Sequence, residues 1–169
     1  MKEMVPDASS QLGKFIFSRF EEPPATEARP EIQVFRYKRP TLKPGKKRAG
    51  AHLASTDILT AFIQVFEHGG ENVMHSHAGM DGFWLVLSGA ARFYTGDGKT
   101  YDVGRLEGVC TPRNLKYWFE RIGDDPLEIL QVDAIHPNIK NTFTADAGTD
   151  DAMEAETNAL AFFDAQQEK

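Results

Sequence analysis

The sequence predicts an all-β fold, in which short strands form a small sandwich or barrel. Three observations support this prediction. Short runs of β-branched and aromatic residues recur between residues 51 and 135, and glycine-rich turns separate many of them. The chain of 169 residues is 41% hydrophobic and 11% aromatic, which suffices for one packed core. No internal repeat interrupts the pattern.

The chain is expected to divide into three parts. Residues 1–30 contain four prolines and few periodic apolar positions, which indicates an N-terminal arm that crosses the barrel or a neighbouring subunit. Residues 31–137 hold the strand-like runs and are predicted to form the barrel. Residues 138–169 are predicted to be a loop followed by a helix over Asp151–Phe163, because this segment opens with acidic residues and carries apolar positions along one helical face.

The barrel strands are expected to follow one another at short intervals. The first is Ile32–Tyr37, which is rich in β-branched and aromatic residues. The other predicted strands are Leu59–Phe66, His75–His77, Phe83–Leu87, Ala91–Tyr94, Tyr101–Val103, Val109–Thr111, Tyr117–Arg121 and Leu127–Val132. A hairpin turn is expected at Thr95–Lys99, where two glycines flank an aspartate.

Charge is distributed unevenly along the chain. Residues 1–50 carry 11 Lys/Arg and 6 Asp/Glu, whereas residues 51–140 carry 7 and 12, and residues 141–169 carry 1 and 7. The acidic body argues against nucleic acid as a partner. The basic cluster from Arg36 to Arg48 is interpreted as an exposed loop, and its second interpretation is an anion site or a patch that meets the acidic tail of another subunit.

Cysteine content and hydropathy indicate the compartment. Cys110 stands alone, so an internal disulfide is excluded, and we expect it to be a buried structural thiol. A reducing compartment is the default for such a chain. No apolar run is long enough to span a membrane, and the first residues lack an apolar signal core. We therefore expect a cytoplasmic protein without a membrane partner.

Two histidines, His75 and His77, carry the clearest chemical signal. They lie one residue apart, between the Gly69-Gly70 turn and the apolar run Phe83–Leu87. On a strand, alternate side chains point to the same face, so both imidazoles can reach one shared point. A divalent metal ion requires such convergence of nitrogen ligands.

The stretch from Gly69 to Gly123 resembles the cupin superfamily, whose members are small antiparallel jelly-roll barrels. The first cupin motif places a glycine before His-x-His and another after it, as Gly69, His75, His77 and Gly89 do here. The second motif is similar to the stretch Pro112–Phe119. The resemblance implies a cupin jelly-roll β-barrel, to which the residues themselves add the expected N-terminal arm and C-terminal helix.

The chain departs from the cupin motifs at the metal ligands. Gly82 stands where the family has a glutamate, and the neighbouring Asp81 faces the interior only if a bulge forms at Gly82. Tyr117 stands where the family has its third histidine, and a free tyrosine has a pKa of roughly 10. Arg121 replaces the asparagine that ends the second motif.

The resemblance implies a divalent transition metal (Fe, Zn, Ni or Mn) inside the barrel. His75 and His77 would be its ligands, with Tyr117 as a third ligand or as part of the pocket wall. Tyr117 and Asp81 are the candidate catalytic acid and base, and Asp81 is otherwise interpreted as a turn residue. The other candidate pocket residues are Gln64 and Gln131, which could add oxygens, and Trp84, Phe93 and Trp118. For these three aromatic residues barrel core is the first interpretation, and a place at the cavity mouth is the second.

Three functions remain open from the sequence, and a small organic ligand or substrate is expected in each. The first is a metal-dependent enzyme of oxygenase (dioxygenase), isomerase or lyase type. The second is a non-catalytic module that binds or senses the small molecule. The third is a metal-free, epimerase-like cupin that uses histidine and tyrosine as base and acid. A homodimer is expected, with the N-terminal arm and the C-terminal helix as interface material.

Overall fold

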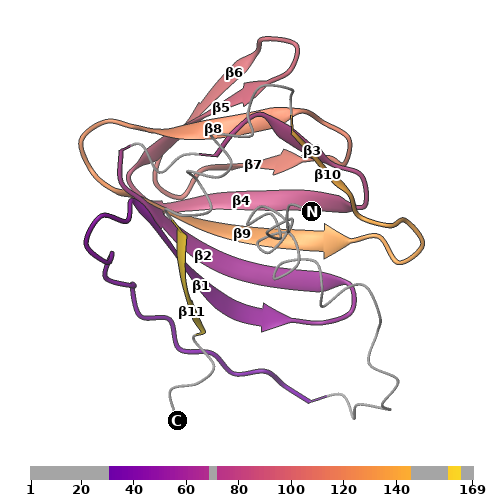
Figure 1. The fold of residues 1–169 in the computed structure, drawn as a ribbon, viewed down its shortest axis with the longest axis horizontal. Helices are drawn as coiled ribbons and strands as arrows, with labels where there is room; N and C mark the ends of the chain where they lie inside the picture. The colour runs from indigo at the N-terminus through magenta and orange to yellow at the C-terminus, as the bar shows by residue number, and fades with distance from the viewer. Residues whose placement is uncertain (1–30, 69–71, 146–159, 165–169) are drawn as a thin grey trace, which may run out of the picture.

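The computed structural model describes residues 31–68, 72–145 and 160–164 of the chain. The regular structure of these residues is all β-strand (Figure 1). The strands are β1 (Arg48–Ser55), β2 (Leu59–Phe66), β3 (His75–His77), β4 (Met80–Ser88), β5 (Ala90–Thr95), β6 (Thr100–Val103), β7 (Gly108–Thr111), β8 (Tyr117–Ile122), β9 (Leu127–Ile135), β10 (Phe143–Ala145) and β11 (Leu160–Asp164). In the described residues, no helix has the length and apolar character needed to cross a membrane.

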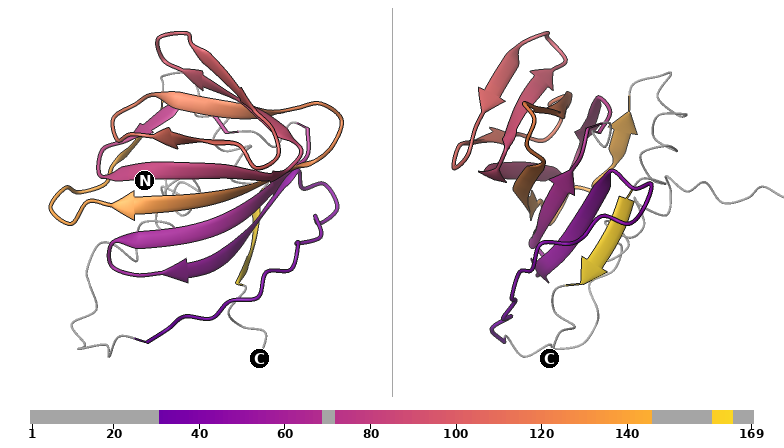
Figure 2. Two further views of the ribbon diagram at one scale, coloured as in Figure 1. Left: turned by 180° about the vertical axis from the view of Figure 1, so that it is seen from behind. Right: turned by 90° about the vertical axis from the view of Figure 1, so that its left-hand side faces the viewer.

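The strands form two sheets. The larger sheet has the order β11-β1-β2-β9-β4-β7, and the smaller has the order β10-β3-β8-β5-β6. Strands β4, β9, β2 and β1 lie side by side across the lower half of Figure 1, while β8, β5 and β6 lie above them. The pairings in both sheets are antiparallel, except that β11 runs parallel to β1, beside which it lies in the right-hand view of Figure 2. The predicted all-β class is therefore confirmed.

An apolar core fills one part of the space between the sheets. Phe119 of β8 lies at its centre, with ring centroids 5.2 Å from Phe66, 5.2 Å from Trp84 and 5.0 Å from Phe93. Phe119, Trp84 and Phe93 alternate along their strands with less buried residues, as a half-buried strand requires, whereas β2 is buried throughout from Phe62 to Phe66. Burial of each large apolar side chain stabilises the fold by roughly 1.5–3 kcal/mol. The core holds the two sheets together and thereby fixes the strands that carry the polar residues described below.

The strands expected between Leu59 and Val132 are all present. The structure confirms the predicted hairpin turn, where the Gly98 nitrogen donates to the Thr95 oxygen at 2.9 Å and Gly98 adopts φ of 82°. Strands β4 and β9 are longer than expected, since they begin at Met80 and end at Ile135 respectively. The extension of β9 matters because it includes Asp133, which is wholly buried.

The strand expected at Ile32–Tyr37 is absent, and that prediction was wrong. Ile32 is 92% exposed and Val34 is 64% exposed, so the apolar pattern has no sheet to bury against. The segment is held instead by the Gln33 side chain, which donates to the Ser55 oxygen at 2.7 Å and accepts from the Ser55 nitrogen at 3.1 Å. Strand β1 supplies the first barrel strand in its place.

The end of the expected helix Asp151–Phe163 is also corrected. Residues 151–159, like the expected arm at residues 1–30, lie outside the described residues. Residues 160–163 belong to strand β11, which pairs with β1 in the register Arg48 to Leu160 through His52 to Asp164. The edge of β1 offers unpaired backbone groups, and pairing satisfies them. A local helical pattern gives no sign of that distant partner.

Two smaller expectations differ from the structure. Cys110 is exposed, not buried, because it lies on the outer face of β7 opposite Phe83. The segment expected to be a loop after residue 137 contains the short strand β10, which pairs with β3. This pairing places Phe143 opposite His77, so β10 forms one wall of the histidine site.

Candidate functional site

Strand β3 places His75 and His77 on the same interior face. Their side chains are buried, with residue exposures of 5% and 9%. The ring centroids are 5.0 Å apart, and the ring planes are nearly perpendicular at 83°. Phe143 of β10 lies against both rings, with its centroid 5.0 Å from His75 and 5.5 Å from His77. The two imidazoles are therefore neighbours in a mostly aromatic surrounding.

The backbone fixes the tautomer of His75. Its Nδ1 lies 2.6 Å from the Val73 carbonyl oxygen, which can only accept, so Nδ1 carries the proton. The Nε2 atom is then left with its lone pair as a hydrogen-bond acceptor. The pKa of His75 is lowered to about 4, chiefly by burial. The hydrogen bond to Val73 opposes this lowering, and the charge of Arg48 adds to it. Burial and the neighbouring His75 lower the pKa of His77 to about 3. Both rings are neutral at pH 7.

Tyr117 faces His75 across the β3–β8 pair. The two residues are register partners, and their ring centroids lie 4.6 Å apart. Tyr117 is 3% exposed. Burial raises its pKa above the ordinary tyrosine value, and the charge of Asp133 adds to the rise, while a hydrogen bond with Thr111 opposes it. Tyr117 is thus a neutral phenol beside a neutral imidazole.

A row of hydrogen-bonded polar side chains crosses the larger sheet. On β1 and β2, the Nε and Nη2 atoms of Arg48 donate to the Gln64 Oε1 at 3.0 and 2.7 Å. The Nε2 atom of Gln64 then donates to the Gln131 Oε1 on β9 at 2.5 Å. The Nε2 atom of Gln131 donates to both carboxylate oxygens of Asp133, at 3.0 and 2.8 Å. The donors all point from the arginine toward the aspartate.

Asp133 ends this row opposite Gly82 in the β4–β9 ladder. It is wholly buried, and burial raises its pKa to about 7, against the effect of the Gln131 bond. A Cβ at position 82 would lie 2.6 Å from the Thr111 Oγ1 and 3.6 Å from the Asp133 Oδ1. Thr111 is held there, because its Oγ1 accepts from the Trp84 Nε1 at 3.1 Å. Position 82 therefore has no space for a longer side chain.

Together these groups form a polar belt around the interior of the barrel, next to the apolar core. We define the belt as Arg48, Gln64, His75, His77, Thr111, Tyr117, Gln131 and Asp133. Its members come from β1, β2, β9, β7, β8 and β3, and the charge of Arg48 acts on both His75 and Tyr117. The belt thus combines one fixed cation, one carboxyl group and several neutral donors and acceptors.

The structure gathers most of the site residues expected from the sequence. His75, His77, Tyr117, Gln64 and Gln131 all lie in the belt. Two further expected residues border it. Trp84 touches the belt through its indole N–H, and Phe93 lies in the apolar core with its ring centroid 5.9 Å from that of Trp84.

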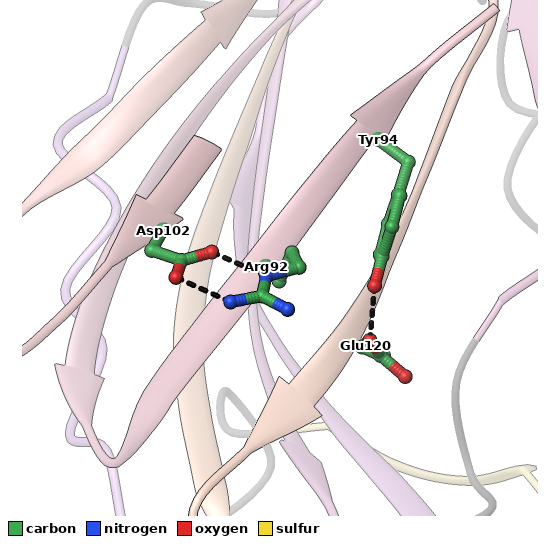
Figure 3. A network of polar contacts seen from close by, with 4 residues as sticks. All are labelled: Arg92, Tyr94, Asp102 and Glu120. Carbon is green, nitrogen blue, oxygen red and sulfur yellow. Dashed lines mark hydrogen bonds and ion pairs between the residues drawn. The ribbon is translucent and has the colours of Figure 1, made fainter. Parts of the chain in front are cut away.

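Asp81 and Trp118 do not reach the belt. The Asp81 Oδ1 accepts from the Arg113 nitrogen at 2.7 Å on the outside of the barrel, and the β4 register shows no bulge at Gly82 to turn it inward. Trp118 stacks on Tyr94, with ring centroids 4.5 Å apart, on the outer face of the smaller sheet. Figure 3 shows the surface ladder beside this pair, in which Arg92 binds Asp102 and Tyr94 binds Glu120.

Three belt residues were missed by the sequence analysis: Arg48, Asp133 and Thr111. Arg48 was assigned to the exposed basic loop, but it begins β1 and is 8% exposed, with its guanidinium carbon 4.9 Å from the centre of the Phe66 ring. Asp133 lies just past the expected end of its strand at Val132. The alternation Ile129, Gln131, Asp133 was the available signal for the second of these.

The belt does not fit a resident divalent metal ion. Within the described residues, no three His, Cys, Asp or Glu side chains converge as metal ligands. The amide oxygens of Gln64 and Gln131 already accept hydrogen bonds, and Tyr117 is a neutral phenol. The positive charge of Arg48 acts on His75, where a cation would have to bind. Two neutral imidazoles beside a guanidinium leave the charge of a metal ion uncompensated.

Comparison with known proteins supports the fold. Residues 62–133 match the cupin domain family. The structure is similar to an RmlC-like cupin family protein from Methanocaldococcus jannaschii, at 22% identity and a TM-score of 0.52 over 63% of this chain and 93% of the other. It is also similar to an uncharacterized conserved protein with a double-stranded β-helix domain from Klebsiella pneumoniae, at 20% identity and a TM-score of 0.55 over 74% and 97%. No curated protein matches the chain.

The barrel therefore has the cupin fold, as the motifs around His75 and His77 predicted. Its fold is the double-stranded β-helix of the similar structures. At these identities the likeness extends to the fold and not to the chemistry. The function must be argued from the belt itself.

Proposed function

We propose that this cupin binds a small organic molecule against the His75–Tyr117 side of the polar belt, without a resident metal ion. The observation that supports this most strongly is the contact between His75 and Tyr117, whose ring centroids are 4.6 Å apart. The His75 Nε2 can accept a hydrogen bond, and the Tyr117 hydroxyl can donate one. A guest with a hydroxyl group and a carbonyl group on adjacent carbons matches this pair.

The composition of the belt supports a binding role over a packing role. Buried polar groups cost stability unless they are paired, and a barrel built for stability alone has apolar side chains at such positions. Here Arg48, Asp133 and two histidines are all less than 10% exposed. The apolar core beside them already holds the sheets together. This composition supports a role for the belt other than holding the sheets together.

The metal-dependent enzyme expected from the family resemblance is the second candidate. One observation favours it: His75 donates its Nδ1 proton to the Val73 oxygen, as histidines that bind metals commonly do. The missing carboxylate at Gly82 and the charge of Arg48 weigh against it. The two candidates differ in whether binding survives complete removal of metal.

Ligand-induced stabilisation of metal-free protein tests the proposal. Protein treated with EDTA would be screened with small hydroxy ketones, 2-hydroxy acids and aldoses while its melting temperature is followed. A compound at 100 times its Kd should stabilise the protein by about 2.7 kcal/mol. Tyr117→Phe and His75→Ala should reduce the shift. Stabilisation that appears only after a divalent metal is restored would overturn the proposal and support the metal-dependent candidate.

A further inference from the structure

We propose that the outer face of the larger sheet is the docking site of the chain's own N-terminal arm, through the apolar residues between Leu12 and Phe20. The inference goes beyond the proposed function, because it concerns the opposite side of the sheet from the polar belt. It assigns an occupant to a surface that neither the cupin motifs nor the belt uses.

The outer face of the larger sheet is apolar, although the outward positions of an antiparallel sheet are usually polar. Val132 of β9 lies between Ala61 of β2 and Phe83 of β4. Phe83 lies in turn opposite Cys110 of β7, so this apolar row crosses four strands. We define the outer patch as Leu59, Ala61, Phe83, Cys110, Val132 and Ala134.

The outer patch is open to solvent in the part of the chain that the structure describes. Phe83 is 49% exposed and Leu59 is 39% exposed. Cys110 and Ala134 are exposed as well. A connected apolar surface of this kind marks a site of interaction, whereas scattered single apolar residues do not. The patch therefore fits a partner that is itself apolar.

The described chain meets the edge of the outer patch at Gln33. The amide group of its side chain donates to the Ser55 oxygen at 2.7 Å and accepts from the Ser55 nitrogen at 3.1 Å. Ser55 ends strand β1, and Leu59 begins the strand that pairs with this end of β1. The arm that precedes Gln33 is thus tethered beside the patch.

Among the segments outside the described residues, the N-terminal arm has the composition that fits the outer patch. Residues 146–159 contain five Asp or Glu residues and one large apolar residue, Met153. Residues 69–71 and 165–169 contain no large apolar residue. Removal of two apolar surfaces from water is favourable, so the arm is the segment that gains from this contact. Its large apolar residues are Leu12, Phe15, Ile16, Phe17 and Phe20.

The arm is long enough to reach the whole outer patch of its own chain. Eleven residue steps lead from Phe20 to Glu31, the first described residue, and three of the residues between them are prolines. A proline-rich linker extends by about 3.1 Å per residue, so this one spans about 34 Å. The four strands of the patch extend over only about 14 Å. The tether also raises the local concentration of the arm, which favours it over the same surface of a second copy.

The reactivity of Cys110 measures whether the outer patch is covered. It is the only cysteine of the chain and lies opposite Phe83 in the patch. Full-length protein at low micromolar concentration would be treated with iodoacetamide, and alkylation would be followed by mass spectrometry. The double variant Phe15→Ser, Phe17→Ser should be alkylated at least about tenfold faster, because the contact of two large apolar side chains is lost.

A polar change in the same arm provides the control for alkylation. The double variant Glu21→Ser, Glu22→Ser replaces two charged residues next to the apolar segment and should react at the rate of the unmodified protein. Equal rates in the unmodified protein and in both variants would overturn the inference.

Cleavage of the arm gives a second measurement from the other side of the contact. Trypsin cuts after Lys14 and Arg19, which lie within the apolar segment. Phe83→Ser removes the aromatic ring of the outer patch, so cleavage at these two sites should become several-fold faster. Tyr101→Ser is the matched control, because Tyr101 is 48% exposed and lies on β6 of the smaller sheet. Both substitutions are made at the surface of the barrel, and equal cleavage in the two variants would overturn the inference.

The dependence on protein concentration separates the chain's own arm from a second copy. Docking within one chain is independent of concentration, so the alkylation rate of Cys110 in the unmodified protein should not change on dilution. A rate that rises on dilution, together with a dimer in sedimentation analysis, would show that a second copy covers the outer patch. That result would overturn the inference and leave the proposed function of the belt unaffected.

Discussion

Gly82 on β4 stands directly opposite Asp133 on β9, and the carboxylate turns toward the position where residue 82 has no side chain. The acidic group of the barrel has therefore moved to the adjacent strand, relative to the position that the cupin motif leads one to expect. Asp81 is the only acidic residue of β4, and its side chain faces outward. The pairing of two strands, and not the motif itself, places a carboxyl group in this site.

Gly82→Ala tests whether the position opposite Asp133 must stay empty. A Cβ there would lie 2.6 Å from the Thr111 Oγ1 and 2.9 Å from the Trp84 Nε1, so these groups would have to move. We expect a destabilisation of about 1–3 kcal/mol, measured by urea unfolding. Gly104→Ala is the matched control, since its Cβ would come no closer than 3.6 Å to the Glu107 carboxylate. Equal stability of the two variants would contradict the packing described around Gly82.

The buried carboxyl group of Asp133 makes stability fall as pH rises. Its pKa is raised from 3.8 to about 7 in the folded protein, so the protonated form is favoured by folding. This contribution is complete below pH 3.8 and is lost as pH rises toward 7; it amounts to about 4 kcal/mol as an order of magnitude. The Asp133→Asn variant lacks this contribution. Between pH 4 and pH 8 the free energy of unfolding of the unmodified protein should therefore fall by more than that of the variant. A constant difference over this range would show that Asp133 does not titrate there.

Local patterns predicted most of the barrel and five of the eight belt residues, but they missed the arginine and the aspartate of the belt. The strand at Leu59–Phe66 was predictable, because its apolar residues and the turns around it are neighbours in the chain. Arg48 and Asp133 were not, because their place in the interior depends on how β1 pairs with β2 and how β9 pairs with β4. Strand β11 shows the same limit, since its partner β1 lies far away in sequence.

The two histidines should make the protein sensitive to acid. Burial lowers the pKa of His75 from 6.5 to about 4 and that of His77 from 6.5 to about 3, so folding favours the neutral rings. Their contribution is complete above pH 6.5 and is lost as pH falls toward these values; it is on the order of 3 kcal/mol or more for each ring.

Replacement of the imidazoles tests this acid sensitivity. His75→Gln and His77→Gln should reduce the loss of stability between pH 6.5 and pH 4, measured by urea unfolding at each pH. His136→Gln serves as a control outside the belt. An unchanged slope in the first two variants would mean that the imidazoles are not held neutral.

Metal content gives the sharpest distinction between the two candidate functions. The belt offers a divalent ion two neutral imidazoles beside a guanidinium, so we expect purified protein to carry far less than one transition metal ion per chain. EDTA should leave the melting temperature unchanged, because no folding energy depends on a metal ion. Elemental analysis of the protein and of a His75→Ala, His77→Ala variant should give the same low values. One ion per chain, lost in that variant, would show that Arg48 does not prevent metal binding and that the metal-dependent candidate is correct.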